Sequence, residues 1–147
     1  MVVDQGVLLS RQVASAPRTI AQLRKLKLCV LTGSTGNVVA KRVRPAPTVR
    51  QFKRVSFLMQ SLQTGLCEAV VYDAPSLATL RVRVPSRYGG FAGVLRTRES
   101  YAVALPKGSA LTAQVNTVLT ALRVDGTLRR LEKQWLSVDL SGLRVLT

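Results

Sequence analysis

The sequence predicts an α/β fold: a mostly parallel sheet with helices between its strands, followed by two further helices. Two observations carry this prediction. Short apolar runs alternate with segments of helical spacing through residues 5–105, as in βαβ units. From residue 106 onward the pattern is helical only. The 147 residues are 47% hydrophobic, which is enough for the core of one ordinary domain or of two small lobes.

Each expected element rests on a local pattern. The clearest strand is 69–73, a continuous apolar run of the kind that is buried on both faces of a parallel sheet. Pro45 and Pro47 end the helix before them, and Gly65 is a natural helix C-terminus. We expect further strands at residues 5–11, 28–31, 53–56, 89–95 and 101–105. We expect helices at residues 17–26, 37–43, 57–65 and 76–80, and two amphipathic helices between residues 109 and 136 that are separated at Asp125-Gly126.

Charge is the most unusual property of the composition. The chain has 22 Lys and Arg residues against 7 Asp and Glu residues, a net charge of +15, which makes nucleic acid or an anionic membrane the first partners to consider. The basic residues are spread from Arg11 to Arg144, however, without interleaved aromatic residues that could stack on bases. A solvated basic face is therefore the favoured interpretation, and binding to nucleic acid or to an anionic surface stays open as the alternative.

Targeting signals and cysteines bear on the compartment. No run of about eighteen apolar residues is present, so we expect no membrane-spanning helix. The first residues lack the features of a signal peptide, which predicts a cytoplasmic protein if the sequence is complete as given, or a piece of a longer chain.

Cys29 and Cys67 lack a metal-binding spacing and histidine is absent, so we expect no metal and no other cofactor. Buried free thiols are the default expectation, with a disulfide as the alternative.

A turn of small residues at 31–37 follows the strand at 28–31 and precedes a helix. A helix that begins there leaves free backbone N–H groups, and the helix dipole favours a carboxylate or phosphate at that end. Ser34 and Thr35 can add hydroxyl donors, and Gly36 allows close approach to the backbone. The turn lacks the phosphate-loop and dinucleotide-binding signatures, so nucleotide binding is not supported. Taken alone, the turn is best interpreted as a helix cap by Ser34 or Thr35.

Four stretches of the sequence match a known pattern: residues 28–36, 62–73, 101–109 and 119–136. The last stretch is the most specific, with an Asp-Gly-Thr turn at 125–127 and a helix that closes on Lys133-Gln134-Trp135. Together the four stretches cover most of residues 5–136. They resemble the bacterial extracellular solute-binding proteins of family 3, which bind polar amino acids for ABC importers.

The resemblance implies a type II periplasmic-binding-protein fold, in which two α/β lobes hold the ligand in the cleft between them. Residues 1–105 resemble the second, ligand-binding lobe, and residues 106–136 resemble the helical pair that normally packs on the first lobe. Residues 137–147 form a short tail. The N-terminal portion of the first lobe has no counterpart in this sequence. We therefore expect a truncated or split member of the family, or a chain whose start has been misplaced.

The resemblance also implies which residues bind the ligand. Thr35 and Gly36, with Ser34 beside them, match positions that contact the ligand carboxylate. Asp73 matches the acidic residue that accepts hydrogen bonds from the α-ammonium group, although on its own it would be interpreted as a helix cap. Two neighbouring parallel strands that end at one edge of a sheet would bring a donor-rich turn and a carboxylate together, which suits a zwitterion. The variable pocket positions of the family fall on Tyr72 and Thr32.

We therefore expect a solute-binding component of an amino-acid ABC transporter, periplasmic or extracytoplasmic as in the parent family. Its expected partners are a small polar amino acid and permease subunits, and no nucleic acid. We do not expect an enzyme: histidine is absent, and of the plausible acids Glu68, Asp73 and Glu99, none is placed as a second carboxylate for Asp73. Exposed apolar residues of the last two helices should drive dimerisation, aggregation or repacking, or contact a first lobe supplied in trans. They are Leu119, Leu122, Leu131 and Trp135.

Overall fold

The structure is a computed structural model that describes residues 2–43, 49–136 and 142–147. Its strands are β1 (Val2–Leu9), β2 (Leu28–Leu31), β3 (Arg50–Phe52), β4 (Ala69–Asp73) and β5 (Phe91–Ser100). Its helices are α1 (Ile20–Leu23), α2 (Thr35–Val43), α3 (Val55–Gln63), α4 (Ala74–Arg83), α5 (Leu111–Val124) and α6 (Thr127–Leu136), with a 3-10 turn η1 (Pro85–Arg87). This order confirms the predicted α/β region followed by two helices.

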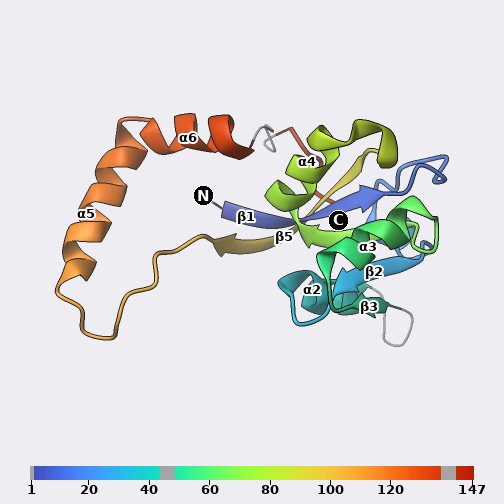
Figure 1. The fold of residues 1–147 in the computed structure, drawn as a ribbon, viewed down its shortest axis with the longest axis horizontal. Helices are drawn as coiled ribbons and strands as arrows, with labels where there is room; N and C mark the ends of the chain where they lie inside the picture. The colour runs from blue at the N-terminus through green and yellow to red at the C-terminus, as the bar shows by residue number, and fades with distance from the viewer. Residues whose placement is uncertain (1, 44–48, 137–141) are drawn as a thin grey trace.

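The five strands form one sheet in the order β3-β2-β4-β1-β5. β2 pairs in parallel with β3 and β4, whereas β1 runs antiparallel between β4 and β5. Four strands therefore point the same way, which confirms the mostly parallel fold class. The reversed direction of β1 brings its N-terminal half to the edge where β4 and β5 end (Figure 1).

Helices cover both faces of the sheet because its central strands are apolar on both sides. α1 and α2 cover one face, and α3 and α4 cover the other. Neighbouring residues of a strand point to opposite faces. Val30 and Val71 accordingly lie in the core under α1 and α2, whereas Cys29 and Val70 lie in the core under α3 and α4.

Cys29 of β2 and Cys67, just before β4, form a disulfide with a Cα–Cα distance of 5.9 Å. Both side chains are fully buried. The default expectation of free thiols is therefore wrong, and the alternative holds. The two cysteines are 38 residues apart in the sequence, and they meet because β2 and β4 are neighbours in the sheet.

Two predicted strands are misplaced. β3 spans residues 50–52, and residues 53–56 lead instead into α3, which begins at Val55. Residues 101–105 contain no regular structure. Both errors concern short segments, for which pairing with a neighbouring strand decides the structure more than the local pattern does.

β5 continues through the polar segment 96–100, which the sequence pattern places between two strands. Its exposure alternates: Arg96 and Arg98 are exposed, whereas Thr97 and Glu99 are half-buried. Antiparallel pairing with β1 supplies the backbone partners of this segment. A polar stretch can therefore complete the strand, and it carries Glu99 to the carboxyl edge of the sheet.

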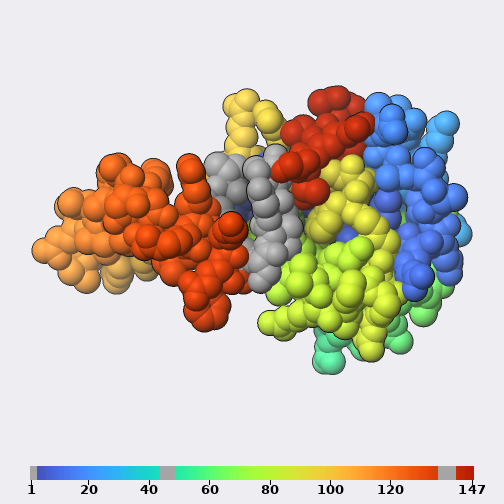
Figure 2. Space-filling view, turned by 90° about the horizontal axis from the view of Figure 1, so that it is seen from above, coloured from blue at the N-terminus to red at the C-terminus, as the bar shows by residue number. Residues whose placement is uncertain are grey.

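α5 and α6 leave the compact part of the chain. No described side chain of either helix is buried, and Figure 2 shows the two helices projecting from one side of the lobe. Leu131 is 42% exposed and Trp135 is 71% exposed, as predicted, while Leu119 and Leu122 are half-buried. No helix of the described residues is long and apolar enough to cross a membrane.

Part of the predicted tail, residues 137–147, packs against the sheet. Residues 137–141 lie outside the described residues, and 142–147 return to the sheet. Val145 forms a parallel bridge to Val94 of β5, with backbone hydrogen bonds on either side of it. Leu146 is 3% exposed and belongs to the core under α1 and α2. The end of the described chain thus covers the outer edge of β5.

Candidate functional site

The carboxyl edge of the sheet gathers four polar side chains from four elements. Asp73 ends β4, and Gln5 lies opposite it on β1. Glu99 comes from the last part of β5, and Thr35 from the first turn of α2. The antiparallel direction of β1 is what brings Gln5 to this edge. The turn after β2 and the carboxylate after β4 therefore approach the same place, with two further residues between them.

Hydrogen bonds join these four side chains. Gln5 Nε2 donates to Asp73 Oδ1 at 2.8 Å and to Glu99 Oε2 at 3.4 Å. Thr35 Oγ1 donates to Glu99 Oε1 at 2.8 Å. Gln5 is fully buried, and its Oε1 has no hydrogen-bond partner within the described parts of the chain. We call this group the edge cluster: Gln5, Thr35, Asp73 and Glu99.

Two small residues shape the start of α2. Ser34 Oγ donates to Leu31 O at 2.8 Å and accepts from the N–H of Asn37 at 3.2 Å, so its hydroxyl caps the helix. Gly36 is buried against β4, and a Cβ at this position would lie 2.6 Å from Val71 O. The helix can begin this close to β4 only because Gly36 has no side chain. The predicted part of Ser34 and Gly36 in ligand binding stays a prediction.

Asp73 occupies the N-cap position of α4, yet its carboxylate makes no capping hydrogen bond. It accepts from Gln5 instead. The helix-cap interpretation is therefore wrong for this residue. α4 needs less capping because Pro75, near its start, has no N–H to satisfy. The carboxylate is thus held at the edge of the sheet by a side chain from another strand.

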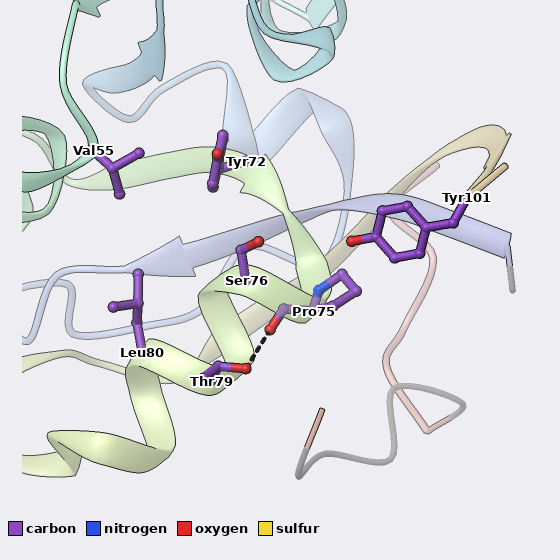
Figure 3. A pocket seen from close by; sticks show the side chains of 7 residues that line it. All are labelled: Val55, Tyr72, Pro75, Ser76, Thr79, Leu80 and Tyr101. Atoms are coloured by element: carbon purple, nitrogen blue, oxygen red, sulfur yellow. Dashed lines mark hydrogen bonds between the residues drawn. The ribbon is translucent and has the colours of Figure 1, made fainter. Parts of the chain in front are cut away.

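Tyr72 and Tyr101 stand close enough to Asp73 to be affected by its charge. Burial raises the pKa of Tyr72 above its ordinary value of 10.0, and the negative charge of Asp73 raises it further. The pKa of Tyr101 is raised by burial, by Asp73 and by Tyr72, in that order. Both rings line a cavity of about 340 Å³ beside the first turns of α4 (Figure 3). Its lining consists of Val55, Tyr72, Pro75, Ser76, Thr79, Leu80 and Tyr101.

Thr32 is the predicted site residue with the weakest structural support. It is exposed just beyond β2, and its N–H donates to Phe52 O at 2.8 Å. Its side chain belongs to neither the edge cluster nor the lining of the tyrosine cavity. Its pocket role stays a prediction.

A larger hollow of about 700 Å³ lies on the α2 side of the sheet and includes Thr35 and Glu99 in its lining. Its other walls come from α1, α2, β5 and residues 145–147. Three of its lining residues are basic: Arg24, Arg42 and Arg96. The acidic edge cluster therefore borders a hollow with basic walls, and Thr35 and Glu99 belong to both.

Sequence reasoning missed Gln5 and Tyr101, and it treated Glu99 only as a possible catalytic acid. The expectation that no second carboxylate lies near Asp73 is wrong, because Gln5 Nε2 reaches both carboxylates. One signal in the sequence is that the polar pair Asp4-Gln5 interrupts an apolar strand, β1. No group of three or more His, Cys, Asp or Glu side chains among the described residues could hold a metal ion.

The fold is that of part of a type II periplasmic-binding protein, with one α/β lobe and a helical extension. No protein-family model matches the chain. The GluR0 ligand-binding core in complex with L-glutamate is similar in structure, with a TM-score of 0.78 and 19% identity over 92% of this chain and 61% of its own. A mutant of ArgBP from T. maritima has a TM-score of 0.74 and 21% identity, covering 94% of this chain and 59% of its own.

A third similar structure is AncCDT-1, an ancestral amino acid-binding protein and precursor of cyclohexadienyl dehydratase. Its TM-score is 0.71 at 24% identity, covering 92% of this chain and 58% of its own. Identities this low show a shared fold and nothing finer. The chain spans only about three fifths of the length of these proteins.

Proposed function

We propose that the edge cluster is one wall of a binding site for a small polar amino acid or a similar zwitterion. A single observation carries the proposal: Asp73 holds a carboxylate that its own helix does not use, at the edge where α2 begins. The carboxylate would bind the ammonium group of a ligand. The N–H groups at Thr35 and Gly36, at the positive end of α2, would bind its carboxylate.

In this proposal the protein is the solute-binding component of an amino-acid ABC transporter, with permease subunits as its membrane partners. The likeness to GluR0 with bound L-glutamate and to amino acid-binding proteins supports the choice of ligand. Since this chain spans about three fifths of those proteins, a further lobe would supply the facing wall. That lobe would come from additional sequence, a separate chain or a second copy, and hinge motion would close the cleft.

We also propose that the protein works outside the cytoplasm, as periplasmic binding proteins do. The buried Cys29–Cys67 disulfide supports this compartment, because such bonds persist in oxidising surroundings. We propose a binding role for the edge cluster, because the sequence has no histidine to exchange protons near neutral pH.

The proposal is tested by titrating the isolated chain with polar amino acids. One wall of a cleft should bind weakly, so we expect chemical-shift changes at Thr35, Gly36 and Asp73 only at millimolar ligand. Asp73→Asn should abolish these changes, whereas Glu68→Gln, at the opposite end of β4, should not. Micromolar affinity by calorimetry would contradict a single-wall site, and the absence of any shift at the edge cluster would contradict amino-acid binding.

A second candidate function is favoured by the net charge of +15 and by the three arginines of the larger hollow. Such a surface could bind nucleic acid or an anionic membrane through phosphate contacts. Affinity for DNA near physiological salt, falling steeply as the salt concentration rises, would favour this function. Binding that is lost already at low ionic strength would count against it.

A further inference from the structure

We infer that Glu99 determines the specificity of the edge cluster, and that the site selects small amines over ligands that carry a carboxylate. The inference rests on the proposed function, because it takes the edge cluster as a ligand site. It adds a ranking of ligands at that site: a small amine binds more tightly than the amino acid that carries the same side chain. Two features of the edge cluster support it: the charges of Asp73 and Glu99, and the hydrogen-bond partners of Thr35 and Gln5.

The two carboxylates of the edge cluster have no charged partner in the described residues. Within residues 2–43, 49–136 and 142–147, Asp73 and Glu99 share the donor group Gln5 Nε2, and the other hydrogen bond to this pair of carboxylates comes from the Thr35 hydroxyl. All of these donors are neutral. Although the chain has 22 Lys and Arg residues, none in its described parts pairs with either carboxylate. Two half-buried carboxylates that have no basic partner among the described residues attract a cation from outside the chain.

Gln5 is fully buried in β1. Its Nε2 faces the two carboxylates, while its Oε1 has no partner in the part of the chain that is described and lies near the start of α2, 3.0 Å from where a Cβ of Gly36 would be. Turning the amide over would place its oxygen against two negative groups. The N–H groups of the Gln5 amide are therefore directed at both carboxylates, at the cost of an oxygen that has no partner among the described residues.

The first turn of α2 is the part of the site where an anion would bind. The hydroxyl of Thr35, which would otherwise be open to a ligand carboxylate, donates to Glu99 Oε1 at 2.8 Å. Glu99 thus stands with its own carboxylate at the first turn of α2. A ligand carboxylate that approached the same N–H groups would meet a like charge and would have to displace Glu99. An amine without a carboxylate meets no such cost.

The basic walls of the neighbouring hollow do not remove this preference. Arg42 and Arg96 line the same hollow as Glu99, but both oxygens of Glu99 accept from Thr35 and Gln5 instead. These two side chains are exposed, as is that of Arg24, which donates to Val43 O at 2.7 Å, so solvent and salt screen the three arginines from the edge cluster. The amine selectivity is therefore set by Glu99 together with Asp73.

The test uses two ligand pairs that differ only by a carboxylate: 1,5-diaminopentane with L-lysine, and 1-aminopentane with L-norleucine. Dissociation constants are measured by NMR titration of the full chain. We expect each amine to bind at least about fivefold more tightly than its amino acid. Glu99→Gln should remove or reverse that ratio by weakening the amines and strengthening the amino acids.

The matched control is Glu68→Gln, which makes the same change of net charge at the opposite end of β4 and should leave both ratios unchanged. Circular dichroism and a melting curve verify that each variant is folded. If the amino acids bind wild type as tightly as the amines, or if Glu99→Gln leaves the ratios unaltered, the inference is wrong and the proposed function stands. If none of the four compounds binds wild type or Glu99→Gln, the proposed function itself fails and the inference fails with it.

Discussion

Gly36, in the first turn of α2, lies against the carbonyl oxygen of Val71 on β4 with no room for a side chain: a Cβ there would be 2.6 Å from that oxygen. This contact sets how closely α2 approaches the sheet. It thereby sets the position of Thr35, whose hydroxyl meets Glu99. The geometry of the edge cluster depends on one missing methyl group.

Gly36→Ala should accordingly lower the free energy of unfolding by about 1–3 kcal/mol, because the helix must move away from β4 to admit the Cβ. Gly90→Ala is the control, since nothing lies within 4 Å of a Cβ at Gly90. Urea denaturation of both variants measures the difference. Equal stability of the two variants would show that α2 shifts without strain.

The Cys29–Cys67 disulfide should contribute about 4 kcal/mol to the free energy of unfolding, because it closes a loop across 38 residues in the unfolded chain. Urea denaturation with and without a reductant measures this contribution. The variant that carries both Cys29→Ala and Cys67→Ala should not respond to reductant. A wild-type protein equally stable in reductant would mean that the bond adds nothing to stability.

The charge of Asp73 should be detectable in the pKa values of Tyr72 and Tyr101. Asp73→Asn removes one of the causes that raise the pKa of Tyr72 and Tyr101, so both pKa values should fall toward 10.0 without reaching it, because burial is the larger cause. Tyrosinate absorbance during an alkaline titration reports the change, preferably in a Tyr88→Phe background. Glu68→Gln should leave the titration as it is.

The same shifts predict how stability depends on alkaline pH. Tyr72 and Tyr101 have folded-state pKa values above the ordinary value of 10.0, so the unfolded chain loses their protons first as the pH rises. The stability that they contribute is fully present below pH 10 and is lost as the pH rises through the folded-state values. Urea denaturation at a series of pH values from 9 upward, for wild type and Tyr101→Phe, should give curves that converge with rising pH.

The exposed apolar side chains of α5 and α6 should make the protein associate. Val118 is 56% exposed and Trp135 71% exposed, on helices with no buried side chain in their described residues. Sedimentation at increasing concentration should detect this association, and Val118→Ser with Trp135→Ser should reduce it. Val82→Ser, at an exposed valine of α4, is the control. A clean monomer with mobile α5 and α6 would contradict the prediction.

The sequence by itself determined the fold class and the position of the central elements. Continuous apolar runs such as 69–73 are buried on both faces of a sheet, and helical periodicity identified α5 and α6, because both signals depend only on neighbouring residues. Local pattern also singled out the turn at Ser34 and Thr35 and the carboxylate of Asp73. It could not say what these side chains contact.

Only the tertiary structure decided those contacts. Gln5 meets Asp73 because β1 runs antiparallel between β4 and β5, a direction that no local pattern encodes. Cys29 bonds to Cys67, and Glu99 reaches Thr35, across 38 and 64 residues of sequence. The physical reason is that strand order and direction follow from packing the whole sheet, and they bring together polar residues that are far apart in the sequence. The acidic character of this edge is therefore a property of the assembled sheet.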